Sequence, residues 1–79
     1  MILEIIKPDS HVFTGENIAL VQLPGLDGSF EILANHAPMI SALKKGRIKV
    51  VDGTKQTLYF DIKGGVVEIL QNKVLVLAE

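Results

Sequence analysis

Hydrophobic residues recur along much of this chain with the two-residue period of β-strands. Residues 47–50 alternate polar and apolar side chains, and Leu58, Phe60 and Ile62 alternate with Tyr59, Asp61 and Lys63. Successive side chains of a strand point to opposite faces of a sheet, so this pattern predicts strands with one wet face. Further strands are predicted over residues 2–6, 18–23, 30–33, 66–70 and 73–77.

Turn residues separate these predicted strands. Asp52-Gly53 suits the positive φ angles of a tight hairpin, and Gln71-Asn72 predicts a second turn. Gly64-Gly65 interrupts an apolar stretch, as a bulge or sharp bend would. Residues 38–43 are the one segment that could begin a helix, of a single turn. The pattern indicates an all-β fold, a small antiparallel β-sandwich or flattened barrel of about 8–10 short strands.

Length and composition indicate a single domain over residues 1–79, because a chain this short has no room for a second core. No apolar run approaches the ~20 residues that span a bilayer, and the N-terminus lacks the features of a signal or transit peptide. Eight basic and nine acidic residues argue against a nucleic-acid binder. The absence of cysteine excludes disulfides and thiolate metal sites. We expect a soluble intracellular protein that does not insert into the bilayer.

The polar residues Glu31, Asn35 and His36 make the segment 28–43 the first candidate for an active site. His11 and His36 lack the close spacing of zinc ligands, and no serine lies in a Gly-x-Ser-x-Gly elbow. The glycines at positions 25 and 28 are not followed by the Gly-Lys-Ser/Thr of a phosphate loop. We therefore expect a binding role rather than catalysis, with no catalytic residue, cofactor or metal.

Two sets of basic residues leave alternatives open. The cluster of Lys44, Lys45, Arg47 and Lys49 is either a solvated strand face or a contact for an acidic partner. Lys55 lies beside a predicted hairpin, as the modified lysine of lipoyl and biotinyl carrier domains does. Its neighbours lack the acidic and small or methionine residues that flank the carrier lysine. A stand-alone carrier or adaptor domain of this type is the alternative function.

Several motifs in a fixed order resemble one family. They are Ile6-Lys7-Pro8-Asp9, Val12-Phe13-Thr14-Gly15-Glu16, Leu23-Pro24-Gly25 with Gly28, His36-Ala37-Pro38-Met39, Ala42-Leu43-Lys44-Lys45-Gly46 with Ile48, Gly64-Gly65 with Val67-Glu68-Ile69, Asn72-Lys73-Val74 and Val76-Leu77-Ala78-Glu79. Together they resemble the N-terminal β-sandwich domain of the epsilon subunit of F-type ATP synthases. The resemblance covers essentially the whole chain.

This resemblance implies a non-catalytic subunit of the rotor's central stalk. Such a subunit links gamma to the c-ring and couples proton flow to ATP synthesis. In a bacterium the complex would place it on the cytoplasmic face of the cell membrane as a peripheral protein. The c-ring contacts that the resemblance implies are Asp27, Gly28 and Ser29. The implied gamma contacts, expected near the same end of the sandwich, are His36, Ala37, Pro38, Met39 and Ser41.

The turn positions expected from the resemblance are Gly15, Gly25, Asn35, Gly46, Gly64 and Gly65. Four positions depart from the family pattern. Ala34-Asn35 replaces a Pro-Gly pair, and asparagine can keep a left-handed turn. Glu31 stands where glycine is common, and would be strained if that position required a positive φ. Lys45 replaces a common proline, which lowers the rigidity of that segment.

The chain ends where most family members continue into two C-terminal helices. In the family these helices inhibit ATP hydrolysis, and in some bacteria they bind ATP. For this chain, whether a natural short form or an excised domain, we expect neither property.

Overall fold

The computed structural model describes residues 1–79 and consists of strands and turns. The strands are β1 (Ile2–Lys7), β2 (Ser10–Gly15), β3 (Ile18–Gly25), β4 (Gly28–Leu33), β5 (Met39–Asp52), β6 (Thr57–Leu70) and β7 (Lys73–Ala78). They form one sheet in the order β2-β1-β7-β6-β5-β3-β4. Neighbouring strands are antiparallel except β1 and β7, which run parallel. No helix of a length and apolarity that could cross a membrane is present.

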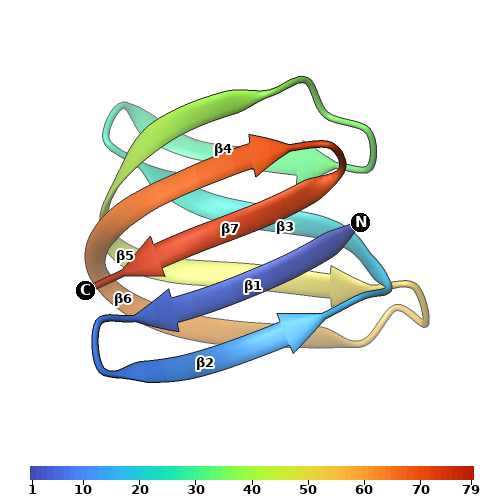
Figure 1. Cartoon of the computed structure of the whole chain (residues 1–79), viewed down its shortest axis with the longest axis horizontal. Helices are drawn as coiled ribbons and strands as arrows, with labels where there is room; N and C mark the ends of the chain where they lie inside the picture. The colour runs from blue at the N-terminus through green and yellow to red at the C-terminus, as the bar shows by residue number, and fades with distance from the viewer.

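The two longest strands fold this single sheet into a sandwich. β5 and β6 each contain 14 residues and curve from one layer into the other (Figure 1). The first half of β5 and the second half of β6 lie with β7, β1 and β2, which we call the β1/β7 layer. The second half of β5 and the first half of β6 lie with β3 and β4, which we call the β3/β4 layer. The prediction of an all-β sandwich is confirmed.

The strands are fewer and longer than the sequence pattern predicts. The strands predicted over 58–63 and 66–70 are both parts of β6. The helical turn that residues 38–43 could have begun is absent, because residues 39–43 begin β5 and pair with β6 from Met39↔Ile69 to Leu43↔Gly65. β2 is a strand that the pattern missed. Its residues are at most half-buried, as befits an edge strand that pairs with β1 alone.

The core lies between the two layers and is wholly apolar. No polar or charged residue is buried. Phe13 of β2 and Phe60 of β6 meet across the layers with ring centroids 5.1 Å apart. Burial of such side chains is the main favourable term in folding. The buried hydrophobic residues are Leu3, Ile5, Ile18, Val21, Leu23, Ile32, Leu43, Ile48, Val50, Ile62, Val67, Ile69, Val74, Val76 and Ala78.

Gly64 and Gly65 mark the bend at which β6 leaves the β3/β4 layer for the β1/β7 layer. Their φ angles are 150° and 148°, which side chains of L-residues rarely allow. A Cβ on Gly65 would also overlap the backbone carbonyl oxygen of Leu77 on β7. The bend predicted here is present, and the strand continues through it.

Two predicted turns depend on left-handed residues. Gln71 and Asn72, at φ 51° and 63°, form the two-residue turn between β6 and β7. Asn35 has a φ of 64°, so asparagine supplies the left-handed conformation predicted for it. Between β5 and β6 the hairpin is present, but its positive φ falls on Lys55, at 69°, and not on Gly53. The loop there has four residues, 53–56, and is therefore longer than the predicted tight turn.

One further turn prediction, at Gly46, is wrong, and the condition under which Glu31 would be strained is not met. Gly46 lies inside β5 and not in a turn, and a Cβ there would come within 2.8 Å of the Cβ of Pro24. A close approach of β3 therefore explains the glycine. Glu31 lies in β4, paired with Gln22, and has no positive φ. Glutamate in an extended strand carries no backbone strain, so its replacement of glycine is tolerated.

Candidate functional site

Neither histidine belongs to a catalytic arrangement. His11 Nε2 lies 3.9 Å from Glu4 Oε2, and both side chains are partly exposed on the outside of the sandwich. His36 Nδ1 donates a hydrogen bond to the carbonyl oxygen of Ala37, 2.7 Å away, within its own turn. No group of three or more His, Cys, Asp or Glu side chains is placed to hold a metal ion.

The predicted gamma-contact residues His36, Ala37 and Pro38 lie in the exposed loop between β4 and β5. The backbone N–H of Asn35 donates to Asn72 Oδ1 at 2.8 Å, which fixes this loop against the β6–β7 turn. Figure 1 shows the two loops side by side at one end of the long axis. Sequence separation hides this contact, because Asn35 and Asn72 are 37 positions apart.

The predicted c-ring residues Asp27, Gly28 and Ser29 lie at the opposite end of β4 (Figure 1). The expectation that the His36 turn is close to them is therefore wrong, since the whole length of β4 separates the two. Ser41 does lie near them. The N–H of Leu26 donates to the carbonyl oxygen of Ala42 at 3.3 Å, and Ser41 and Asp27 line one hollow of about 310 Å³.

Apolar side chains cover the outside of the β1/β7 layer. Ile40 is 72% exposed and Leu70 is 52% exposed. The strand register places Ala42, Val66, Leu77 and Ile6 side by side in one row across four strands. A contiguous exposed patch of this kind marks an interaction surface. We call it the apolar face; its members are Ile2, Ile6, Ile40, Ala42, Val66, Leu70, Leu75 and Leu77.

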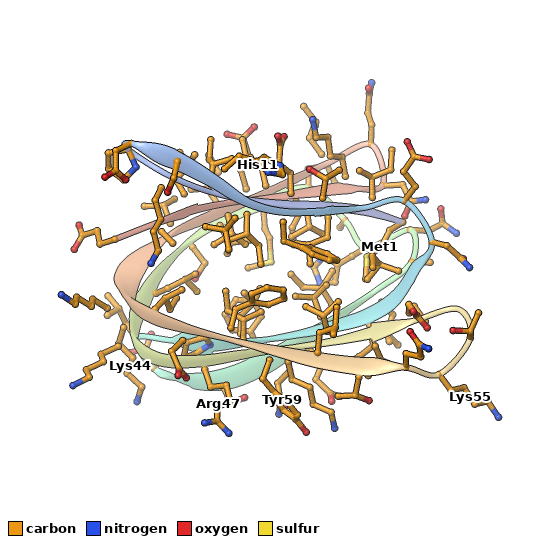
Figure 2. The ribbon with its side chains drawn as sticks, turned by 90° about the horizontal axis from the view of Figure 1, so that it is seen from below. Met1, His11, Lys44, Arg47, Lys55 and Tyr59 are labelled. Atoms are coloured by element: carbon orange, nitrogen blue, oxygen red, sulfur yellow. The ribbon has the colours of Figure 1, made fainter.

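The outside of the β3/β4 layer is charged instead. Arg47 Nε lies 3.3 Å from Asp61 Oδ1, and the Arg47 guanidinium lies 5.4 Å from the centre of the Tyr59 ring. Figure 2 shows Lys44, Arg47 and Tyr59 on the side of the molecule away from His11. Both members of the Arg47–Asp61 pair are well exposed, so screening by water leaves it little energetic value. This geometry fits the interpretation of the basic cluster as a solvated strand face.

None of the predicted contact residues belongs to the apolar face. Ile40, Val66, Leu70 and Leu77 were not singled out, although a signal for them exists. Apart from Glu68 and Lys73, residues 66–70 and 73–77 are apolar on both strand faces, whereas a strand with one wet face alternates. Near-continuous apolar strands are typical of sheets covered on both sides. The signal therefore predicts a covering partner for this layer.

Lys55 lies exposed at the tip of the loop between β5 and β6 (Figure 2). The Asp52 carboxylate organises this loop by accepting hydrogen bonds from the N–H groups of Thr54 and Gln56 at 2.9 and 3.0 Å and from the Thr54 hydroxyl at 2.7 Å. Exposure on a hairpin is a feature that this lysine shares with a carrier lysine.

The model of the family described as ATP synthase, Delta/Epsilon chain, beta-sandwich domain matches residues 1–79. The chain belongs to this family. The ATP synthase epsilon chain of Caulobacter vibrioides is 40% identical over 75 residues, which are 95% of this chain and 85% of that relative. The epsilon chain of Maridesulfovibrio salexigens is 42% identical over 79 residues, all of this chain and 54% of that one.

Solved structures show the same fold. A chain in the cryo-EM structure of the Euglena gracilis mitochondrial ATP synthase, comprising OSCP, F1 and the c-ring, superposes with a TM-score of 0.92 at 20% identity. The match covers 99% of this chain and 49% of that one. Membership of the delta/epsilon family disfavours the carrier-domain alternative for Lys55.

Proposed function

We propose that this chain is a non-catalytic subunit of the rotor of an F-type proton-transporting ATP synthase. In this role it joins the gamma subunit to the c-ring and helps couple proton flow to ATP synthesis. The observation that carries the proposal is the match to the delta/epsilon family along the whole chain. The complex holds the chain at the cytoplasmic face of a bacterial cell membrane as a peripheral protein.

The gamma subunit covers the apolar face in this proposal. Pro38, Met39 and Ile40 line a hollow of about 440 Å³ together with Leu70, so the His36 turn borders that face directly. His36 and Ala37 are exposed beside it, and the half-buried Ser41 lies further along β5. Burial of large exposed side chains such as Ile40 supplies the main driving force for such a contact.

The c-ring contacts the β3–β4 turn at Asp27, Gly28 and Ser29. Gly28 has a φ of 130° and no atom lies within 4 Å of the position of its missing Cβ, so the turn presents backbone to its surroundings. This turn and the His36 turn lie at opposite ends of β4 (Figure 1). The separation allows the chain to engage two partners at once.

Binding to the gamma subunit of the same organism tests this function. The purified chain should form a complex with gamma at micromolar concentration in isothermal titration calorimetry. Ile40→Asp should weaken the complex by about tenfold or more, because a fully buried isoleucine contributes about 1.5–3 kcal/mol. Leu33→Asp is the matched control, since Leu33 is 57% exposed on the other layer. Absence of any complex with the unmodified chain would refute the proposal.

A further inference from the structure

Glu68 stands within the apolar face without an ionic partner. It alternates in β6 with the buried Val67 and Ile69, so its side chain points outward. Its register partners on the two adjacent strands are apolar, Ile40 on β5 and Leu75 on β7. The three ion pairs of the structure involve other carboxylates.

The other carboxylate on this face is balanced within the chain. Glu4 on β1 also neighbours Leu75, and its Oε1 lies 3.6 Å from Lys73 Nζ. Its Oε2 lies 3.9 Å from His11 Nε2. Lys73 is the basic residue of β7 and lines one hollow together with Glu68, but its ion pair is with Glu4. Glu68 is therefore the carboxylate on this face whose charge is left for a partner to neutralise.

Two hollows flank Glu68 and explain how it would be covered. One, of about 440 Å³, lies towards Met39 and Ile40. The other, of about 340 Å³, lies towards Ile2 and Leu75 and is also lined by Gln71 and Lys73. Apolar side chains that filled both hollows would exclude water from Glu68 between them. A desolvated carboxylate is strongly unfavourable unless a cation or hydrogen-bond donors replace the lost water.

We propose that Glu68 is a specificity-determining residue that receives an arginine side chain of the gamma subunit. This inference rests on the proposed function and adds the chemistry of the partner surface, a basic residue flanked by apolar ones. Arginine suits the position because its planar guanidinium binds a carboxylate through two parallel hydrogen bonds and is less strongly hydrated than lysine. A single charge pair within an otherwise apolar contact fixes the register of the two surfaces.

Calorimetric titration of gamma with three variants of the full chain tests the assignment. Glu68→Gln keeps the shape and removes the charge, and should lower the affinity by about tenfold or more. Glu68→Leu should also lower it, because the arginine would lose its partner; against an apolar partner surface the same variant would bind more tightly. Glu31→Gln, exposed on the outside of the β3/β4 layer, is the control and should bind as the unmodified chain does.

The outcomes separate this inference from the proposed function. If the unmodified chain binds gamma and Glu68→Gln binds equally well, or Glu68→Leu binds more tightly, the assignment of Glu68 is overturned while the rotor function stands. If the unmodified chain does not bind gamma, both fall. The assignment would also be overturned if the Tm of Glu68→Gln were so low that the variant is unfolded under the assay conditions. A structural role of Glu68 would then explain the loss of binding. Restored binding between Glu68→Arg and a gamma variant with one arginine changed to glutamate would identify the partner residue.

Discussion

Substitution of Gly65 by alanine tests how the sheet passes from one layer to the other. Gly64 and Gly65 share nearly the same φ, 150° and 148°, so alanine meets a comparable backbone strain at either position. Their surroundings differ. A Cβ at position 64 would lie 3.5 Å from the carbonyl oxygen of Leu43, an ordinary contact, whereas one at position 65 would overlap the carbonyl oxygen of Leu77. Gly64→Ala is thus a matched control for strain alone.

The two variants should differ by the cost of moving β7. A non-glycine residue in this φ region costs of order 1–3 kcal/mol, which applies to both variants. Forcing an extra methyl against packed neighbours adds about 1–3 kcal/mol, which applies to Gly65→Ala only. The overlap is with backbone, so no side-chain rotation relieves it. The total for Gly65→Ala, about 2–6 kcal/mol, is a large part of the 5–15 kcal/mol typical of small domains.

Urea denaturation followed by circular dichroism, together with thermal melts, measures both effects. At about 6 °C per kcal/mol for a domain of this size, Gly65→Ala should melt about 6–18 °C below Gly64→Ala. Equal stabilities of the two variants, within about 0.5 kcal/mol, would contradict the overlap with Leu77. Stability of both variants equal to that of the unmodified chain would contradict the strained bend altogether.

Two further predictions concern the core and the loop between β5 and β6. Ile69→Ala should lower the free energy of unfolding by about 2–5 kcal/mol, because Ile69 is 2% exposed. Ile40→Ala should change it by no more than about 0.5 kcal/mol, because Ile40 is 72% exposed. Urea denaturation of the isolated chain measures both changes. The Thr54 hydroxyl, together with the backbone N–H groups of Gln56 and Thr54, holds the pKa of Asp52 below its usual 3.8, although burial opposes this shift. A lowered folded-state pKa gives stability that is present above the unfolded-state pKa and is lost as pH falls through the folded-state value. Thr54→Val should therefore raise the Asp52 pKa in an NMR titration, and an unchanged pKa would contradict the hydrogen-bond origin.

Local signals in the sequence predicted where several turns lie, although the hairpin after Asp52 is longer than predicted and Gly46 lies within a strand. The left-handed conformations of Asn35 and of the Gln71-Asn72 pair follow from the backbone preferences of single residues. The bend at Gly64-Gly65 was predicted for the same reason. Gly46 shows the limit of this reasoning, because its requirement comes from Pro24 on another strand. A glycine that is required because a distant residue approaches it closely cannot be distinguished from a turn glycine by sequence alone.

One cause explains why the sequence left a helical turn possible at 38–43 and why it did not predict the apolar face. Ile40 and Ala42 point outward from β5, yet they are as apolar as the inward-facing Met39 and Leu43. Alternation disappears where a strand is apolar on both sides, so the sequence pattern neither identifies the strand nor shows which face is outside. Such strands are explained by an additional covering layer, which a single chain cannot reveal.

The parallel pairing of β1 with β7 affects how the chain folds as it is made. β7 lies between β1 and β6 in the sheet, so the β1–β2 hairpin does not reach its place in the sheet until β7 has left the ribosome. Pairing of segments so distant in the chain is slow, because the entropy of closing the long loop is lost before the contacts form. A nascent chain lacking β7 leaves Leu3 and Ile5 without their neighbours Val74 and Val76. The apolar face can therefore assemble only in copies whose β7 has been made.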